Sequence, residues 1–386
     1  MSSIFFDAIR KISSSQLTEI TVASDRCIDV SCKTKKICSI CQDNCTVDAI
    51  NIGERVEIDW NKCIKCGICA SVCPTEVFKI QAPSDNKILR SIAGSSKDEN
   101  IIIECDFVNK SFQGKEKRPR TSGRKIIVPC IGRFSETFLL LSTLSGGDKV
   151  EYVGCTSDCS FSIGKEVIDK MWWRTENLFK IFEKKPIENK EDIHSNNKDQ
   201  SGRRKLLRET GFQAIELLLS QKDQSTGLSN VNIKTPPQRA ELLQLIGMYS
   251  PPTILIDRKE MPFSNIKLSP EKCRLSGICA SVCPTDALQF LENYQGKELS
   301  FKIGLCVGCE ACVYICPEEA LEINKEIDLG LLSSPRQTIM NLKYQLCTSC
   351  GKQFSVKTGY DSSICKSCVK SQSFLEEYGK DSKISS

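Results

Sequence analysis

The sequence predicts a multidomain chain of mixed α/β and α+β class, in which compact cysteine-bound modules surround a small parallel α/β domain. Three observations lead to this prediction. Cysteine accounts for 24 of the 386 residues, and much of it falls in short runs of regular spacing. Short apolar runs in the middle of the chain flank a helical stretch, as in a parallel sheet. Two Cys-x2-Cys pairs near the C-terminus indicate a separate metal-bound ribbon.

The composition narrows the class of protein. Charged residues make up 26% of the chain and the formal net charge is +5, which is typical of a globular protein. The N-terminus lacks a basic stretch followed by a long apolar run, and no apolar stretch reaches the ~18 residues that span a bilayer. We therefore expect a cytoplasmic protein without a membrane span, whose thiols bind metal. The single histidine, His194, excludes a two-histidine Rieske site.

The clearest motif runs from Cys63 to Pro74 with the spacing C-x2-C-x2-C-x3-C-P. Three thiolates on one tight loop can hold three irons of a [4Fe-4S] cluster, and the fourth cysteine belongs to a second cluster. An earlier run, from Cys32 to Cys45, has the spacing C-x5-C-x2-C-x3-C. We expect residues 1–80 to form one two-cluster module, because the proline and the recurrence of the motif disfavour a disulfide framework or a zinc knuckle.

These motifs resemble those of bacterial two-cluster ferredoxins, in which the fourth cysteine of each motif crosses over to the other cluster. The resemblance implies two [4Fe-4S] sites in this module. We interpret Cys27 as a spare thiol, with replacement of Cys32 as first ligand as the alternative. The implied ligand sets are Cys32, Cys38, Cys41 and Cys73 for one cluster, and Cys63, Cys66, Cys69 and Cys45 for the other.

A second module is predicted over residues 261–328. Residues 277–285 are identical to residues 67–75, which indicates an internal duplication, but Ser276 occupies the second cysteine position. The same crossover implies a complete [4Fe-4S] site and a site with one thiolate fewer. The incomplete site is expected to hold a [3Fe-4S] cluster, or a [4Fe-4S] cluster assisted by Ser276 or water; an empty site is the alternative. The ligand sets are Cys306, Cys309, Cys312 and Cys283 for the complete site, and Cys273, Cys279 and Cys316 for the other.

A proline follows the fourth cysteine of three of the four motifs, in Cys73-Pro74, Cys283-Pro284 and Cys316-Pro317, whereas Thr46 follows Cys45. Proline suits the first turn of a helix, where its missing N–H would be unpaired anyway. We therefore predict a short helix after each Cys-Pro pair.

Residues 98–183 carry a different pattern. Three short apolar runs each end at a cysteine, and a helical stretch at 136–144 separates the second run from the third, which predicts a βαβ unit with a parallel sheet. Sites in such sheets gather beyond the carboxyl ends of the strands. Four thiolates there can hold a [2Fe-2S] cluster, although buried structural cysteines are the alternative. The candidates are Cys105, Cys130, Cys155 and Cys159.

The stretch Cys130-Ile131-Gly132-Arg133, with Gly154-Cys155, Cys159 and Gly164, resembles the delta-subunit family of methyl-viologen-reducing hydrogenases over about residues 100–180. The resemblance implies a [2Fe-2S] cluster and electron transfer between a hydrogenase, or a similar donor, and a flavin-containing heterodisulfide reductase. The family usually has Cys-x-x-Cys after its first strand, whereas Val108 occupies the second of those positions here.

The remaining segments connect these parts. Residues 81–99 are polar and rich in serine, which predicts a linker. Residues 165–183 have apolar side chains at helical spacing and are expected to form a core-facing helix. A helical connector is predicted over residues 204–260, with helices at 206–219 and 240–248.

The C-terminal region 340–370 contains the pairs Cys347-x2-Cys350 and Cys365-x2-Cys368. Two thiolate pairs at this separation make a tetrahedral four-sulfur site. The arrangement resembles a zinc ribbon, with rubredoxin-type iron as the alternative. The full fold prediction is therefore ferredoxin-like modules around a small parallel α/β domain, with a C-terminal zinc ribbon.

The predicted iron-sulfur and zinc sites together indicate an electron-transfer subunit of an oxidoreductase complex, because iron-sulfur clusters move single electrons. The sequence shows no dinucleotide-binding or phosphate-binding loop that would supply another cofactor. The two ferredoxin modules are expected to flank the [2Fe-2S] domain. The expected partners are a flavoprotein, a heterodisulfide-reductase-like subunit or a hydrogenase. One alternative is a catalytic disulfide or polysulfide reductase acting at the Ser276 site. A redox-sensing nucleic-acid-binding protein ranks last, since the ribbon lacks a basic, aromatic face.

Overall fold

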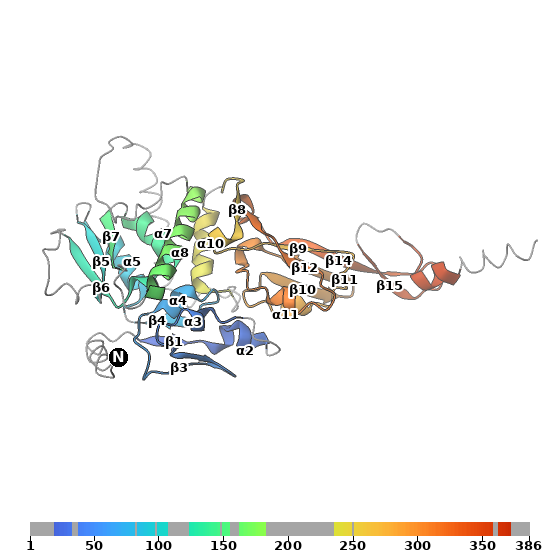
Figure 1. Ribbon diagram of the computed structural model, residues 1–386. Helices are drawn as coiled ribbons and strands as arrows, with labels where there is room; N and C mark the ends of the chain where they lie inside the picture. Colours follow the sequence, from blue (N-terminus) through green and yellow to red (C-terminus); the bar gives the residue numbers. More distant parts are fainter. Residues whose placement is uncertain are drawn as a thin grey trace, which may run out of the picture.

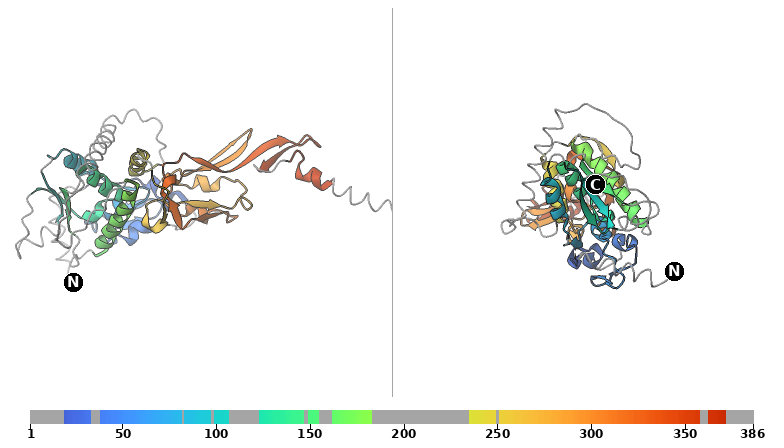
Figure 2. Two further views of the ribbon diagram at one scale, coloured as in Figure 1. Left: turned by 90° about the horizontal axis from the view of Figure 1, so that it is seen from above. Right: turned by 90° about the vertical axis from the view of Figure 1, so that its left-hand side faces the viewer.

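The computed structural model describes residues 19–32, 38–81, 83–96, 99–106, 123–146, 149–154, 162–182, 235–248, 251–357 and 362–371. A parallel sheet lies at one end of the molecule and strand β15 (Gln353–Lys357) at the other (Figures 1 and 2). Within these residues no helix is both long enough and apolar enough to cross a membrane.

Two pairs of short antiparallel strands frame the N-terminal module. Strand β1 pairs with β4, and β2 pairs with β3. Three short helices carry or adjoin the cysteines of the module. The elements are β1 (Ile20–Val22), α2 (Ile28–Cys32), α3 (Ile40–Asp43), β2 (Ile50–Ile52), β3 (Val56–Ile58), α4 (Ile68–Val72) and β4 (Phe78–Ile80).

The C-terminal module repeats this plan, as the duplication predicts. The pair β9–β12 corresponds to β1–β4, and the hairpin β10–β11 corresponds to β2–β3. Strand β14 extends the hairpin into the sheet β10-β11-β14-β15, so the C-terminal ribbon is joined to this module by backbone hydrogen bonds. The elements are β8 (Leu255–Asp257), β9 (Ile266–Leu268), α11 (Ile278–Ser281), β10 (Leu288–Asn293), β11 (Gly296–Phe301), α12 (Ala311–Tyr314), β12 (Leu321–Ile323), β13 (Glu326–Asp328) and β14 (Gln337–Leu346).

Strands, not helices, follow the fourth cysteine of each motif, so the helix prediction is wrong. The third residue after each of these cysteines has a left-handed backbone, which interrupts a right-handed helix. The chain then enters β2, β4, β10 or β12. The residues are Asp48 (φ 50°), Glu76 (φ 55°), Asp286 (φ 60°) and Glu319 (φ 48°).

The predicted parallel sheet is confirmed. Strand β5 (Ile101–Cys105) lies between β6 (Arg124–Val128) and β7 (Val150–Val153) and is parallel to both. All five residues of β5 are buried, as expected for the central strand of a covered sheet. The helices predicted between and after the strands are α7 (Glu136–Gly146) and α8 (Ser162–Phe179).

The predicted linker at 81–99 contains a helix, α5 (Asp85–Ala93), and the linker prediction is wrong for those residues. Ser84 caps the helix, since its hydroxyl accepts a hydrogen bond from the Lys87 backbone N–H at 3.3 Å. Ile88, Leu89 and Ile92 are buried. The polar composition that predicts a linker is therefore the exposed face of an amphipathic helix.

Helix α10 (Pro237–Gly247) bears out the predicted helix at 240–248, whereas the predicted helix at 206–219 lies outside the described residues. Leu242, Leu245 and Ile246 of α10 join an apolar core that extends from Ile68 in the N-terminal module to Met340. In Figure 1, α10 and α8 stand between the parallel sheet and the C-terminal module.

The two ferredoxin-type modules also contact each other directly. Ile28 of the first packs against Ala311 of the second, with Cys38, Val282 and Cys309 beside them. The prediction that the two modules flank a central parallel domain is therefore wrong, because the modules contact each other directly. The parallel domain lies at one end, and the N-terminal module contacts both other parts.

Candidate iron-sulfur and metal centres

Three cysteine loops have the same backbone shape. In each loop the second and fourth residues after the first cysteine have a left-handed backbone, which wraps the loop around a common centre. Glycine is required at two of these positions by space as well as by φ. A methyl group on Gly67 would lie 2.7 Å from Ile80 Cδ1, and one on Gly277 would lie 2.5 Å from Phe290 Cδ1. The left-handed pairs are Lys65 and Gly67, Leu275 and Gly277, and Gly308 and Glu310.

Backbone N–H groups point at the thiols of these loops. The N–H of Lys65 donates to Cys63 Sγ at 3.4 Å, and the N–H of Leu275 donates to Cys273 Sγ at the same distance. Hydrogen bonds to ligand sulfurs stabilise thiolate and tune the reduction potential of a cluster. Three fourth-position cysteines receive a similar bond from the residue four positions later: Ala49 to Cys45 at 3.2 Å, Val77 to Cys73 at 3.4 Å, and Ala320 to Cys316 at 3.3 Å.

The structure places four cysteines of the N-terminal module near one another: Cys45, Cys63, Cys66 and Cys69. Burial, followed by the charges of Cys63 and Cys45, raises the pKa of Cys66 to about 12. Burial also raises the pKa of Cys69, with Cys66, Cys63 and Cys45 adding to the effect. Cys45 therefore crosses over to the loop of the second motif.

A second group in this module forms around Cys41. Burial, followed by the charges of Cys73, Cys38 and Cys27, raises the pKa of Cys41 to about 12. Cys27 is 6% exposed and has a charge interaction with Cys38 and Cys73 as well. The side chain of Cys32 lies outside the described residues. The cysteine that we interpreted as a spare thiol thus lies with three predicted ligands.

The C-terminal module has the same two groups. Burial, and then the charge of Cys283, raises the pKa of Cys306 to about 12. Burial also raises the pKa of Cys312, and the charges of Cys306, Cys309 and Cys283 add to the effect. In the other group, burial followed by Cys273 and Cys316 raises the pKa of Cys279 to about 11. Ser276, at the missing cysteine position, is exposed.

These buried thiols share one chemical property. Crowded together without a cation they remain protonated, because burial and mutual repulsion both oppose the thiolate. Iron supplies the positive charge that a group of thiolates needs, and metal binding releases the protons. The donor sets therefore fit iron-sulfur clusters.

Two of the four cysteines predicted at the sheet edge are described. Cys105 ends β5, and Cys130 follows β6 after one intervening residue. The Cys105 thiol donates to the Pro129 carbonyl at 3.4 Å. Gly154 brings the end of β7 so close that a methyl group there would lie 2.7 Å from Cys105 Cβ. All three strand ends thus meet at one edge, while Cys155 and Cys159 lie outside the described residues.

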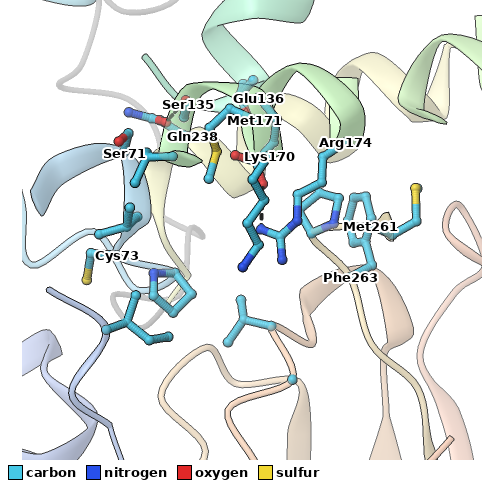
Figure 3. A pocket seen from close by; sticks show the side chains of 18 of the residues that line it. Ser71, Cys73, Ser135, Glu136, Lys170, Met171, Arg174, Gln238, Met261 and Phe263 are labelled. Atoms are coloured by element: carbon cyan, nitrogen blue, oxygen red, sulfur yellow. Dashed lines mark hydrogen bonds and ion pairs between the residues drawn. The ribbon is translucent and has the colours of Figure 1, made fainter. Parts of the chain in front are cut away.

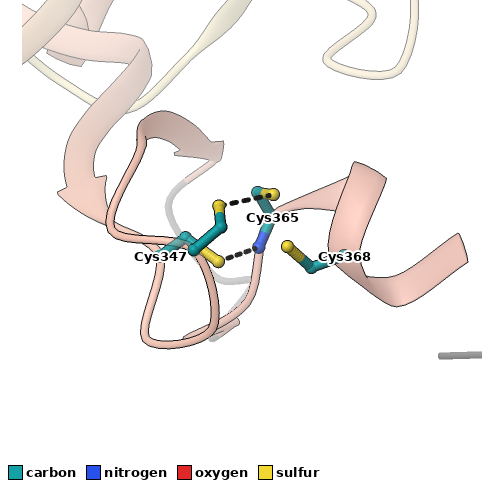
Figure 4. A group of neighbouring side chains, drawn as sticks. Cys347, Cys365 and Cys368 are labelled. Atoms are coloured by element: carbon teal, nitrogen blue, oxygen red, sulfur yellow. Dashed lines mark hydrogen bonds between the residues drawn. The ribbon is translucent and has the colours of Figure 1, made fainter. Parts of the chain in front are cut away.

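The C-terminal ribbon holds four thiols in one group. The sulfurs of Cys347, Cys350, Cys365 and Cys368 all lie within 4.8 Å of one another (Figure 4). The Cys365 backbone N–H donates to Cys347 Sγ at 3.2 Å and is the main cause that lowers the pKa of Cys347, to about 6. A thiolate at neutral pH favours metal capture. The arrangement fits one tetrahedral metal ion, and zinc remains our prediction for it.

Replacing Cys350 with serine is expected to remove one zinc per chain and leave the iron content unchanged, because the four sulfurs form a site separate from the iron-sulfur loops. Metal analysis of the purified variant checks this. Ser371→Ala, a change on the adjacent short helix, serves as control and should keep its zinc. Bound iron in place of zinc in the unmodified protein would show a rubredoxin-type site instead.

Two family models match the chain. A 4Fe-4S binding domain matches residues 56–79, and a 4Fe-4S dicluster domain matches residues 265–317. The second match spans both motifs of the C-terminal module, including Ser276. No curated protein matches the chain significantly. The protein therefore contains two ferredoxin-type [4Fe-4S] domains, which support a role in iron-sulfur electron transfer.

Proposed function

We propose that the chain is the electron-conducting subunit of an oxidoreductase complex, and that its clusters form one path from the parallel domain to the C-terminal module. The observation that carries the proposal is that neighbouring parts of the protein pack against each other at their cysteine loops. Two such junctions support a continuous path.

The first junction joins the sheet edge to the N-terminal module. Helix α4 contacts the short helix η2 (Ile131–Arg133), and the Ser71 hydroxyl donates to the Gly132 carbonyl at 2.6 Å. A methyl group on Gly132 would lie 3.3 Å from both Ile68 Cγ1 and Cys130 Sγ. Ile68, the residue before Cys69, therefore lies close to Cys130, a candidate ligand of the [2Fe-2S] site.

The second junction joins the two ferredoxin-type modules. Cys38 and Cys309 both pack around the contact between Ile28 and Ala311. These cysteines belong to two different proposed clusters, one in each module. Within each module the clusters are also neighbours, since Cys41 affects the pKa of Cys69 and Cys279 affects that of Cys312.

We assign Cys27, in place of Cys32, as the fourth ligand of the cluster with Cys38, Cys41 and Cys73. The basis is the burial of Cys27 and its charge interaction with all three. The proposed order is then the [2Fe-2S] site, the Cys63 cluster, the Cys73 cluster, the Cys306 cluster and the Cys273 site. A flavoprotein, heterodisulfide-reductase-like or hydrogenase partner at the ends of this path, in the cytoplasm, is part of the proposal.

Electron redistribution across the second junction tests the path. In Ala311→Leu the larger side chain separates Cys38 from Cys309, whereas Ala320→Leu makes the same change at another buried position of the module. After partial oxidation of the reduced protein, freeze-quench EPR should show electrons re-equilibrating between the modules at least tenfold more slowly in Ala311→Leu than in Ala320→Leu at equal iron content. Equal rates in the two variants would contradict a path through this contact.

The exposure of Ser276 favours a second candidate function, reduction of a disulfide or polysulfide at the incompletely ligated cluster. An iron without a protein thiolate can take a sulfur ligand from solution. Rapid oxidation of the isolated, reduced protein by polysulfide supports this function, and inertness under the same conditions counts against it.

A further inference from the structure

We propose that the cavity between the two ferredoxin-type modules binds a small oxyanion that carries a carboxylate or a phosphate group. The cavity has a volume of about 790 Å³ and is open to solvent, within the size range of small-molecule sites. Its walls come from α8, the start of α10, the turn at Cys73 and the loop at Val307–Gly308 (Figure 3). Binding at this site does not depend on the proposed electron path.

Five cationic and four acidic side chains line the cavity, and one of the cations, Arg258, is paired with Glu310 at 2.7 Å. Lys170 and Arg174 extend into the cavity from α8 (Figure 3), and Arg239, Arg258 and Lys259 also line it. Lys170 has no hydrogen bond or ion pair with any described residue. Burial, and then the charge of Arg174, lowers the pKa of Lys170, while the nearby Glu136 opposes the shift.

Most of the acidic side chains of the cavity already have partners. Glu136 lies 3.5 Å from Arg174, and Glu76 accepts the backbone N–H of Gln238 at 2.7 Å, which caps α10. Asp43 accepts a hydrogen bond from the Ser39 hydroxyl at 2.5 Å, and Glu166 is exposed on α8, as is Lys170 one turn later. Glu136 partly offsets the charge of Lys170, and Glu136 and Glu76 partly offset that of Arg239, but Lys170 has no ion pair among the described residues.

Buried hydrogen-bond donors on the cavity wall point to the same chemistry. The Arg239 side chain is 8% exposed, and its guanidinium is fixed over the Phe263 ring at 4.3 Å with Nη2 donating to the Pro262 carbonyl. Its Nη1 and the hydroxyl of Ser264, a residue only 1% exposed, have no partner among the described residues. Arg174 Nε is likewise unpaired there.

Unpaired buried donors are costly, and a ligand that accepts hydrogen bonds relieves them. Guanidinium groups match the paired oxygens of carboxylates and phosphates in geometry and charge. A cation or a neutral donor would satisfy neither Arg239 nor Lys170. The site therefore favours an oxyanion.

Because of its position, the bound anion should change the reduction potentials of neighbouring clusters, and this effect rests on the proposed function. Cys73, a proposed ligand, and Val307, next to Cys306, both line the cavity. Negative charge beside two clusters disfavours their reduction, so the anion should lower both potentials. By linkage it should bind more tightly to the oxidised protein.

Titration calorimetry on the anaerobically purified full chain tests the site, with inorganic phosphate and malonate as probes in chloride buffer. We expect one saturable site per chain, and the tighter probe identifies the preferred group. Lys170→Gln combined with Arg174→Gln should weaken binding at least tenfold. Lys165→Gln, the same change on the same helix at a residue paired with Asp169 at 3.2 Å, should leave the affinity unchanged.

Absence of saturable heat with both probes, or equal affinity in the double variant and in Lys165→Gln at matched iron content, would overturn the proposal. Because the readout is heat and not electron transfer, failure of the electron path alone would leave this binding intact. EPR-monitored potentials with and without the tighter probe then measure the consequence separately.

Discussion

Replacing Cys27 with serine is expected to remove at least one iron per chain, by converting a [4Fe-4S] cluster to the [3Fe-4S] form expected at the Cys273 site. The physical reason is that Cys27 is 6% exposed and interacts with the thiols of Cys38, Cys41 and Cys73. Without it the cluster has three thiolates, and the iron that lacks a thiolate is the one expected to be lost. Iron and acid-labile sulfide analysis of the anaerobically purified variant measures the loss.

Cys32→Ser is the matched control, since it makes the same chemical change five positions later in the same short segment. We expect it to keep its full iron content. The opposite result, loss of iron in Cys32→Ser and none in Cys27→Ser, would restore Cys32 as the ligand and make Cys27 a buried structural thiol.

Replacing Ser276 with cysteine is expected to complete the site of Cys273, Cys279 and Cys316. The loop already has the backbone of its four-cysteine counterpart, with a left-handed Leu275 and Gly277, so a thiolate at position 276 meets no backbone obstacle. We expect about one additional iron per chain and loss of the [3Fe-4S] EPR signal of the oxidised protein.

Ser281→Cys is the control for this gain, because it adds a thiol at another exposed serine of the same motif. Its iron content and EPR spectrum should match those of the unmodified protein. An unmodified protein that already shows four irons at this site would contradict the expected [3Fe-4S] cluster, and a site that stays empty even in Ser276→Cys would indicate that it has lost iron binding.

The regular parts of the fold are predictable from local sequence. The three apolar runs predict the parallel sheet because a strand buried on both faces needs continuous apolar residues, as in Ile101–Cys105. The spacing of the cysteine runs likewise predicts which thiols share a loop, whereas the crossover of Cys45 and Cys73 is implied by the resemblance to two-cluster ferredoxins. Both features depend on residues close together in the chain.

The turns after the fourth cysteine of each motif are harder to predict, because their left-handed positions hold Asp48, Glu76, Asp286 and Glu319 in place of glycine. Aspartate is a common turn residue but glutamate is not, and the proline after three of these cysteines suggests a helix where a strand forms. The helix α5 is hidden for a related reason, since its apolar residues are few and lie among polar ones.

The position of Cys27 and the contact between the modules depend on tertiary packing, which spacing does not encode. Cys27 belongs to a small core with Phe78 and Val56, residues far from it in sequence. The contact of Ile28 with Ala311 joins residues from opposite halves of the chain. The cavity that these contacts leave between the modules could not be predicted either.

Metal and sulfide analysis combined with EPR on anaerobically purified protein tests the central claim most directly. The account predicts about 17 irons and one zinc per chain, a [3Fe-4S] signal in the oxidised protein and a [2Fe-2S] signal on reduction. Only about 8 irons, with extra zinc and no [2Fe-2S] signal, would contradict it, because the parallel domain would then hold no cluster and the path would lose its first member.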